Sequence, residues 1–112
     1  MTPSKPTFFR SPAELRRWFE RNHATATELL VGYHKVATGR PSITWAESVA
    51  EALCFGWIDG IRRRIDEHCY TIRFTPRRPR SRWSAINIRL MKELEAAGRM
   101  THAGRKGFAA WE

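Results

Sequence analysis

The chain has 112 residues, of which 42% are hydrophobic, and it carries a formal net charge of +9. This length and composition predict one domain with a buried core and exclude a disordered tail. No apolar stretch is long enough to cross a membrane, and the N-terminus lacks the apolar region of a signal peptide, so we expect a cytoplasmic protein with no membrane span.

The first predicted element is a helix over residues 11–22. Residues 11–14 (SPAE) are typical of a helix start, because serine can cap the helix, proline suits its first position and glutamate can complete a capping box. The apolar face of this helix is formed by Leu15, Trp18 and Phe19. Before it lies a lead-in segment that we expect to dock onto the domain through Phe8 and Phe9.

A strand and a second helix follow. Residues 28–36 are rich in β-branched and aromatic side chains and predict a strand, and residues 38–42 predict a loop. Residues 44–47 (TWAE) form a second capping-box pattern, and the helix that they begin should end at Gly56. Its buried stripe is predicted to contain Trp45, Val49, Ala52, Leu53 and Gly56.

Two antiparallel strands are predicted over residues 57–65 and 69–75, joined by a turn at residues 66–68. In the second strand, alternation places Tyr70, Ile72 and Phe74 on one face and Thr71 and Arg73 on the other. In the first strand, the side chains that we expect to share a face are Trp57, Ile61 and Ile65. Gly60 is a candidate position for a bulge.

The prolines within residues 76–82 end the sheet, and Ser81 or Ser84 then caps a third helix that stops at Gly98. Its apolar stripe is predicted to contain Trp83, Ile86, Leu90, Leu94 and Ala97. Residues 100–111 indicate the start of a further helix.

The predicted fold is a single small α+β domain over residues 1–112. A three-stranded, mostly antiparallel sheet is covered by three to four helices, in the order α-β-α-β-β-α.

The positive charge is concentrated in one segment, because residues 62–82 carry eight arginines against Asp66 and Glu67, a net charge of +6. This segment leads into the third helix, whose N-terminus has free N–H groups and a partial positive charge. Guanidinium groups bind phosphates and carboxylates with two hydrogen bonds, and indole rings can form an apolar wall. We therefore predict a site for an anionic small molecule or a polyanion, formed by Trp57, Asp59, Arg73, Arg77, Arg78, Ser81, Trp83, Ser84 and Asn87.

Three other interpretations remain open. The basic residues can simply form a solvated face that aids solubility. Residues 62–82 can bind nucleic acid, although the chain has no helix-turn-helix or RNA-binding signature. Alternatively, Asp59 and Arg73 can form the reactive pair of an enzyme in a tryptophan-lined pocket.

The sequence favours a non-enzymatic module without a metal or cofactor. The four histidines lack metal-site spacing, and neither a Ser-His-acid pattern nor a phosphate-binding glycine loop is present, so no catalytic residue is assigned. Cys54 and Cys69 do not form a C-x-x-C pair, and we expect two buried, reduced thiols. The oligomeric state cannot be read from the pattern.

Several segments together resemble the YdeI/OmpD-associated family, which is also described as bacteriocin-protection proteins. The segments are residues 51–59 (EALCFGWID), residues 73–77 (RFTPR), residues 81–84 (SRWS), Asn87 and residues 98–100 (GRM). The resemblance implies a small cytosolic α+β domain with a stress-response role, connected with porin expression and tolerance of antimicrobial peptides. It implies no established reaction. Many family members continue into a C-terminal helical module, which this sequence does not contain, so the chain is expected to be a short member or a shortened form.

Overall fold

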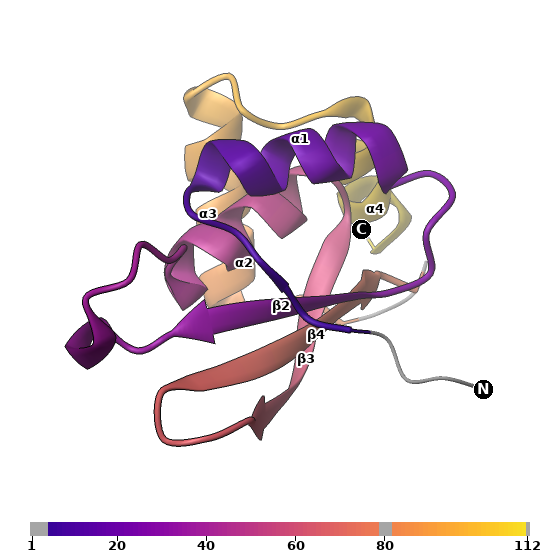
Figure 1. Cartoon of the computed structure of the whole chain (residues 1–112). Helices are drawn as coiled ribbons and strands as arrows, with labels where there is room; N and C mark the ends of the chain where they lie inside the picture. The colour runs from indigo at the N-terminus through magenta and orange to yellow at the C-terminus, as the bar shows by residue number, and fades with distance from the viewer. Residues whose placement is uncertain (1–4, 79–81, 112) are drawn as a thin grey trace.

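The computed structural model describes residues 5–78 and 82–111. In these ranges the chain forms four α-helices, one short 3-10 helix and a four-stranded mixed sheet of order β1-β2-β4-β3 (Figure 1). The elements are β1 (Thr7–Phe8), α1 (Pro12–Asn22), β2 (Leu29–His34), η1 (Val36–Thr38), α2 (Trp45–Cys54), β3 (Trp57–Arg64), β4 (Cys69–Pro76), α3 (Ala85–Ala96) and α4 (His102–Trp111).

The predicted α+β class is confirmed, but the prediction of three strands is wrong. The additional strand is β1, which pairs in parallel with β2 through Thr7–Val31 and Phe8–Gly32. Two residues are too few to show the alternation that marks a strand in the sequence. This pairing depends on Gly32, because a Cβ atom there would lie 2.6 Å from the ring of Phe8.

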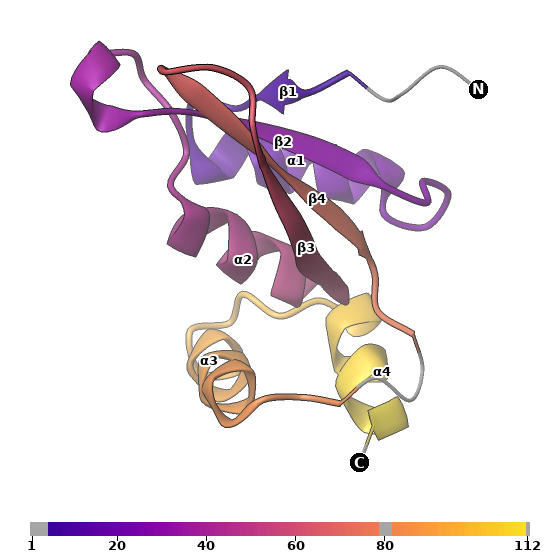
Figure 2. The ribbon, with the colours of Figure 1, turned by 90° about the horizontal axis from the view of Figure 1, so that it is seen from below.

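Strand β4 pairs antiparallel with β2 on one side and with β3 on the other. One face of the sheet packs against the helices (Figure 2). Figure 2 shows α1 and α2 against the sheet, with α3 and α4 beyond α2. The predicted alternation along β4 is confirmed, and Arg73 on the other face is exposed. The β4 side chains on the helix side are Tyr70, Ile72 and Phe74.

Strand β3 contains an irregularity that changes which side chains share a face. Asp59 pairs with Phe74 and Arg62 pairs with Ile72, so β3 takes one residue more than β4 between these two pairs. The predicted bulge near Gly60 is therefore confirmed. The predicted shared face is wrong, because Trp57 is buried whereas Ile61 and Ile65 are 63% and 46% exposed. The extra residue bends and twists β3, so side chains after the bulge do not keep the alternation set by Trp57.

The helix starts follow the local sequence closely. Thr44 and Glu47 form the predicted capping box at α2, and the side chains of Ser11 and Ser84 cap α1 and α3. At α1, Glu14 accepts from the backbone N–H of Arg10 rather than completing a box. Gly56 and Gly98 follow α2 and α3 with φ of 78° and 72°, as expected for glycines at helix ends.

Three residues of the predicted helix stripes are exposed, and one of them is Ala97, the C-cap residue of α3. Trp45, in the first turn of α2, is 51% exposed, and Ile86, in the first turn of α3, is 79% exposed. Periodicity places both on an apolar stripe, but each lies at a helix start that extends past the core. Met91 and Leu94 are the α3 residues that are buried instead.

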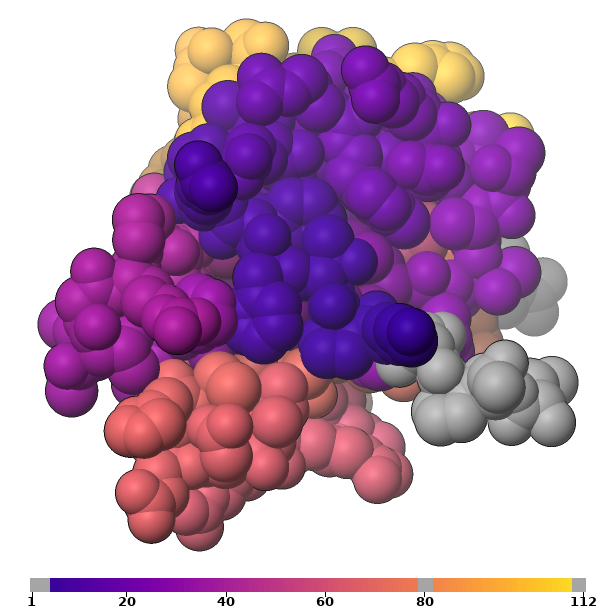
Figure 3. Space-filling view, viewed as in Figure 1, coloured from indigo at the N-terminus to yellow at the C-terminus, as the bar shows by residue number. Residues whose placement is uncertain are grey.

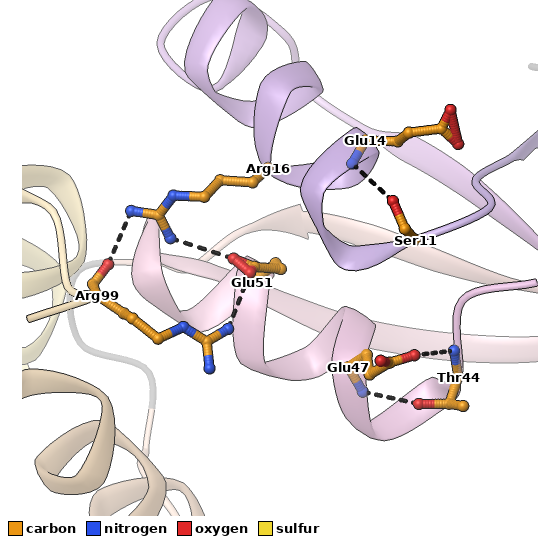
Figure 4. A network of polar contacts seen from close by, with 7 residues as sticks. All are labelled: Ser11, Glu14, Arg16, Thr44, Glu47, Glu51 and Arg99. Carbon is orange, nitrogen blue, oxygen red and sulfur yellow. Dashed lines mark hydrogen bonds and ion pairs between the residues drawn. The ribbon is translucent and has the colours of Figure 1, made fainter. Parts of the chain in front are cut away.

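A buried carboxylate joins three parts of the chain. Glu51 of α2 is 2% exposed and binds Arg16 of α1 at 3.1 Å and Arg99, in the connection from α3 to α4, at 2.9 Å (Figure 4). Arg16 also donates to the carbonyl of Arg99 at 2.9 Å. Charge-assisted hydrogen bonds satisfy the carboxylate in an apolar environment, so this cluster fixes α1, α2 and the C-terminal helices together.

Cys54 and Cys69 are both free and buried, as predicted. Burial, followed by the nearby charge of Glu51, raises the pKa of the Cys54 thiol. None of the helices in the described part of the chain is both long and apolar enough to cross a bilayer.

Candidate functional site

The structure separates the predicted site residues into distinct environments. Trp57 belongs to the core, where its ring makes edge contacts with Trp18 and Phe19. Arg73 lies on the solvent side of the sheet and binds Glu28 through two nitrogens, at 3.0 Å and 2.9 Å. Trp57 and Arg73 therefore do not line a common cavity.

Arg77 and Trp83 are brought together. The Cζ atom of Arg77 lies 4.0 Å from the centre of the Trp83 ring, and the ring of Phe108 contacts Trp83 edge-on. Trp83 is buried, and Arg77 is half-buried. Burial lowers the pKa of Arg77, while the charge of Asp59 acts in the opposite direction. This pair packs α4 against the end of β4, and the role that it can have in binding stays a prediction.

Three further residues of the predicted site, Arg78, Ser84 and Asn87, follow β4 or lie at the start of α3. Ser84 caps α3 by accepting from the backbone N–H of Asn87 at 3.1 Å. Asn87 is half-buried, and Arg78 is exposed. Ser81 lies outside the described residues, so its predicted role in the site is not placed.

Asp59 points toward the helices and fixes an aromatic residue that the sequence interpretation assigned to the core. Its Oδ2 atom accepts a hydrogen bond from the indole N–H of Trp45 at 3.2 Å. Because Asp59 pairs with Phe74 and Arg73 is the next residue on β4, Asp59 and Arg73 lie on opposite faces of the sheet. The structure therefore does not bring together the two residues of the enzyme hypothesis.

Trp45 leads to a groove that the sequence did not predict. The groove has a volume of about 610 Å³ and lies between β2, the loop after it, the start of α2 and the β3–β4 hairpin. We call it the aromatic–cationic groove and define it by six of its lining residues, Tyr33, Lys35, Arg40, Trp45, Arg62 and Tyr70.

Its floor is a stack of three side chains. The rings of Tyr33 and Tyr70 are parallel, with centroids 4.8 Å apart, and the Cζ atom of Arg62 lies 4.0 Å from the centre of the Tyr70 ring. An arginine stacked on an aromatic face keeps its N–H groups at the rim of the guanidinium plane, where they can donate to an oxyanion. Arg62 lines the groove and is exposed, so these donors are accessible to a ligand.

The stack is fixed from below by a hydrogen-bond chain. Ser48 donates its single hydroxyl proton to the carbonyl of Trp45 at 2.7 Å, so the contact of 2.7 Å between the Tyr33 and Ser48 hydroxyls has Tyr33 as donor. Burial raises the pKa of Tyr33 above its usual range, and the phenol stays neutral at physiological pH. The Tyr33 side chain therefore acts as a fixed, uncharged support.

The cations of the groove do not form ion pairs with the acids of the same elements in the described part of the chain. These cations are Lys35, Arg40 and Arg62. Asp66, in the β3–β4 turn, accepts from the backbone N–H groups of His68 and Cys69 at 2.7 Å and 3.0 Å, and these hydrogen bonds lower its pKa. Asp59 and Glu47 are likewise engaged, by Trp45 and by the Thr44 N–H. The groove therefore combines aromatic surface with three cations that are not ion-paired in the described part of the chain, while the neighbouring carboxylates keep their charge.

Within the described ranges, no group of three His, Cys, Asp or Glu side chains is placed to hold a metal ion.

Comparison with protein families matches residues 7–107 to a family described as a domain of unknown function, DUF8412. The chain belongs to this family. The matched region begins in β1 and ends in α4, and it includes the whole aromatic–cationic groove. Comparison with curated proteins and with solved structures gives no match. The resemblance to the YdeI/OmpD-associated family stays a prediction.

Proposed function

We propose that this domain is a non-catalytic binding module for an anionic ligand that carries a planar ring, of which a nucleotide is the simplest example. The observation that carries the proposal is the position of Arg62, stacked on Tyr70 beside Lys35 and Arg40. A phosphate at the rim of Arg62 would receive charge-assisted hydrogen bonds, and the other two cations would add to the attraction.

Trp45 provides the surface for the ring of the ligand. It is half-exposed, lines the groove, and is held by Asp59 through its N–H. Stacking of a base on an aromatic side chain contributes about 1–3 kcal/mol. A fixed indole loses less rotational freedom on binding than a mobile one, so the Asp59 contact favours this use of Trp45.

We propose binding rather than catalysis because Asp59 and Arg73, the predicted reactive pair, each interact with another residue and not with each other. Asp59 orients an indole, and Arg73 binds Glu28 on the far face of the sheet. A cytoplasmic location and a stress-response role remain part of the proposal, and the two free cysteines support the location.

Chemical-shift titration with adenosine 5′-monophosphate, ribose 5-phosphate and adenosine tests this function. We expect adenosine 5′-monophosphate to shift the Trp45 indole N–H and the Arg62 Nε–H signals, and each fragment to bind more weakly. Arg62→Gln should reduce affinity about tenfold, because a hydrogen-bonded charge is lost. Arg89→Gln, an equal change of charge on the exposed face of α3, is the matched control and should leave affinity unchanged.

Equal losses from Arg62→Gln and Arg89→Gln would show attraction by net charge alone and would contradict the proposed site. So would an absence of any shift at low salt.

A second position for an anion is the start of α3, which the sequence predicted. Arg77 lies over Trp83, and Ser84 caps the helix next to them. Titration with inorganic phosphate separates the two positions: shifts at Ser84 and Asn87 would support this one, whereas shifts at Arg62 and Arg40 would support the groove.

A further inference from the structure

Strand β3 forms one edge of the sheet. In the order β1-β2-β4-β3 it pairs with β4 on one side and with no described strand on the other. Residues 60–68, which include the end of β3 and the turn to β4, are all exposed. In Figure 3 the β3–β4 hairpin forms the lower lobe of the molecule. This part of the edge is therefore accessible to another chain.

The backbone of this edge presents hydrogen-bonding groups outward. In an antiparallel pair, successive residues turn their N–H and C=O groups alternately toward the partner strand and away from it. The N–H of Ile65 donates to the carbonyl of Cys69 at 3.1 Å, so Ile65 is turned toward β4. The register continues without interruption back to Arg62, so the N–H and C=O groups of Arg64 and Arg62 point away from β4. These two residues therefore offer donors and acceptors to an added strand.

The side chains of this edge are cationic. Residues 62–64 are three consecutive arginines, and none of them forms an ion pair in the described part of the chain. Arg62 and Arg64 lie on the face of the sheet that Tyr70 occupies. The Tyr70 ring holds the Arg62 guanidinium, and the carbonyl of Asp66 accepts from the Nε–H of Arg64 at 3.2 Å. Both guanidinium groups keep further N–H groups for a ligand.

The opposite face of the strand is apolar at two positions. Ile61 and Ile65, which flank the three arginines, are 63% and 46% exposed. Alternation places them on the face opposite to Arg62 and Arg64. A strand beside β3 would therefore meet positive charge on one face and apolar surface on the other, and its side chains should alternate between acidic and apolar.

Charge argues against a second copy of this chain as the partner. A bulge and charged side chains are common devices that stop sheet edges from pairing with one another, and β3 has both. Two copies paired through β3 would bring the arginines of residues 62–64 beside one another, and like charges on neighbouring strands are destabilising. Opposite charges at the same positions stabilise the pairing, so the edge favours an acidic strand.

The turn after β3 limits where the acidic residues of a partner can lie. Asp66 and Glu67 follow Ile65 directly, and both carboxylates repel an acidic residue placed beyond that point. The acidic positions of the partner are therefore expected beside Arg62 and Arg64, with apolar residues between them on the side of the two isoleucines.

We infer that the edge of β3 binds an extended peptide segment of a partner protein, with alternating acidic and apolar side chains, as an added antiparallel strand. Main-chain hydrogen bonds give such strand addition its affinity, and alternate side chains give it specificity. The antiparallel orientation is the more stable per residue. This binding goes beyond the function proposed above, and the only described residue that lines the groove and also contacts the peptide through its outward backbone is Arg62.

Backbone amide hydrogen exchange in the full chain tests the strand addition. In the free protein the amides of Arg62 and Arg64 should exchange rapidly, whereas those of Arg63 and Ile65, which face β4, should be protected. Saturation with a capped hexapeptide of alternating glutamate and valine should slow exchange at Arg62 and Arg64 by at least about tenfold. Binding that leaves these two amides unprotected would overturn the inference.

N-methylated peptides identify which backbone groups are used. In an antiparallel pairing the residues opposite Arg62 and Arg64, which are the glutamates, donate their N–H groups to β3. N-methylation of the glutamates should abolish binding, whereas N-methylation of the valines should largely retain it. The reverse result would contradict the antiparallel orientation, and equal affinities of the two methylated peptides would contradict strand addition altogether.

Charge is tested on both partners. Arg64→Gln should weaken peptide binding about twofold to fivefold, as expected for an exposed ion pair. Arg89→Gln, the control of equal charge on α3, should leave it unchanged. A hexapeptide of alternating lysine and valine should not bind. The amide spectrum checks that each variant is folded.

Three outcomes of these measurements would overturn the inference. Equal losses from the two arginine variants would show attraction by net charge alone. Tighter binding of a single-stranded oligonucleotide of the same charge would show a general polyanion surface. Protection of the Arg62 and Arg64 amides in the free protein that increases with protein concentration would show that a second copy occupies the edge.

Discussion

The backbone of Gly104 in α4 packs directly against the carbonyl of Cys54 at the end of α2. A Cβ atom at Gly104 would overlap the Cys54 oxygen and carbon, which are backbone atoms that cannot move aside. The same carbonyl accepts hydrogen bonds from the N–H and the hydroxyl of Thr101, just before α4. The end of α2 is thus the contact point that positions α4.

Gly104→Ala should therefore destabilise the domain, although alanine favours a helix. The overlap should cost about 1–3 kcal/mol, more than the gain of about 1 kcal/mol from helix propensity. Gly107→Ala in the same helix is a matched control, because its Cβ would meet only the Gly56 Cα at 3.7 Å. We expect the control to be neutral or stabilising in denaturant unfolding. Similar stabilities for the two variants would show that α4 can shift away from Cys54.

Removing the charge of Glu51 should lower stability by about 1–3 kcal/mol, because Glu51→Gln leaves Arg16 and Arg99 without their common negatively charged partner. The loss should be smaller than that of a fully buried pair, since the two guanidinium groups are 30% and 43% exposed and can be hydrated. Glu95→Gln, which removes the exposed pair with Arg105, should have a much smaller effect. An equal effect of the two substitutions in urea unfolding would contradict a special role for the cluster.

Gly32→Ala should detach β1 from the sheet. The new Cβ would displace the ring of Phe8, which stacks on His34 with centroids 4.4 Å apart. We expect faster hydrogen exchange at the β1–β2 pairing and a loss of roughly 1 kcal/mol. In a Phe8→Ala background the same change should be neutral or stabilising, because no ring remains to be displaced. If Gly32→Ala has the same effect in both backgrounds, the ring contact is not the cause.

The stability contributed by Tyr33 should depend on pH in the alkaline range. Burial raises the pKa of Tyr33 above the value of about 10 expected in the unfolded chain, so the native protein holds this proton more tightly. The contribution is complete below pH 10 and declines as pH rises above 10 toward the native pKa.

Tyr33→Phe provides the measurement. At neutral pH the variant should be less stable by about 0.5–1.5 kcal/mol, because the hydrogen bond to Ser48 is lost. Above pH 10 the difference should shrink and then reverse, since only the native sequence has this phenol to ionise. A difference that stays constant up to pH 11 would show that Tyr33 titrates like a tyrosine in solution.

The parts of the fold that the sequence predicted depend on neighbouring residues. Thr44 and Glu47 form a capping box within one turn, and alternation along β4 gives the orientation of Tyr70. The two-residue β1 gave no pattern, and the exposure of Trp45 depends on how far α2 extends past the core, which periodicity does not reveal.

The groove was missed for the same reason. It depends on the pairing of Tyr33 with Tyr70, which are 37 positions apart in the chain, and on the loop that carries Lys35 and Arg40. The concentration of arginines at residues 62–64 was visible in the sequence, but the partner of each arginine was not. Arg73 has Glu28, whereas Arg62 has the ring of Tyr70, and only the sheet register decides between them.

The cluster at Glu51 also bears on how the domain forms during synthesis. Its three members come from residues 16, 51 and 99, so the first helix and the sheet can emerge from the ribosome well before the last partner of Glu51 does. Until Arg99 is released, this carboxylate lacks one of its two cations and the core lacks Met100. The nascent chain should therefore become resistant to proteases late, when the segment after α3 leaves the exit tunnel, rather than gradually as each strand appears.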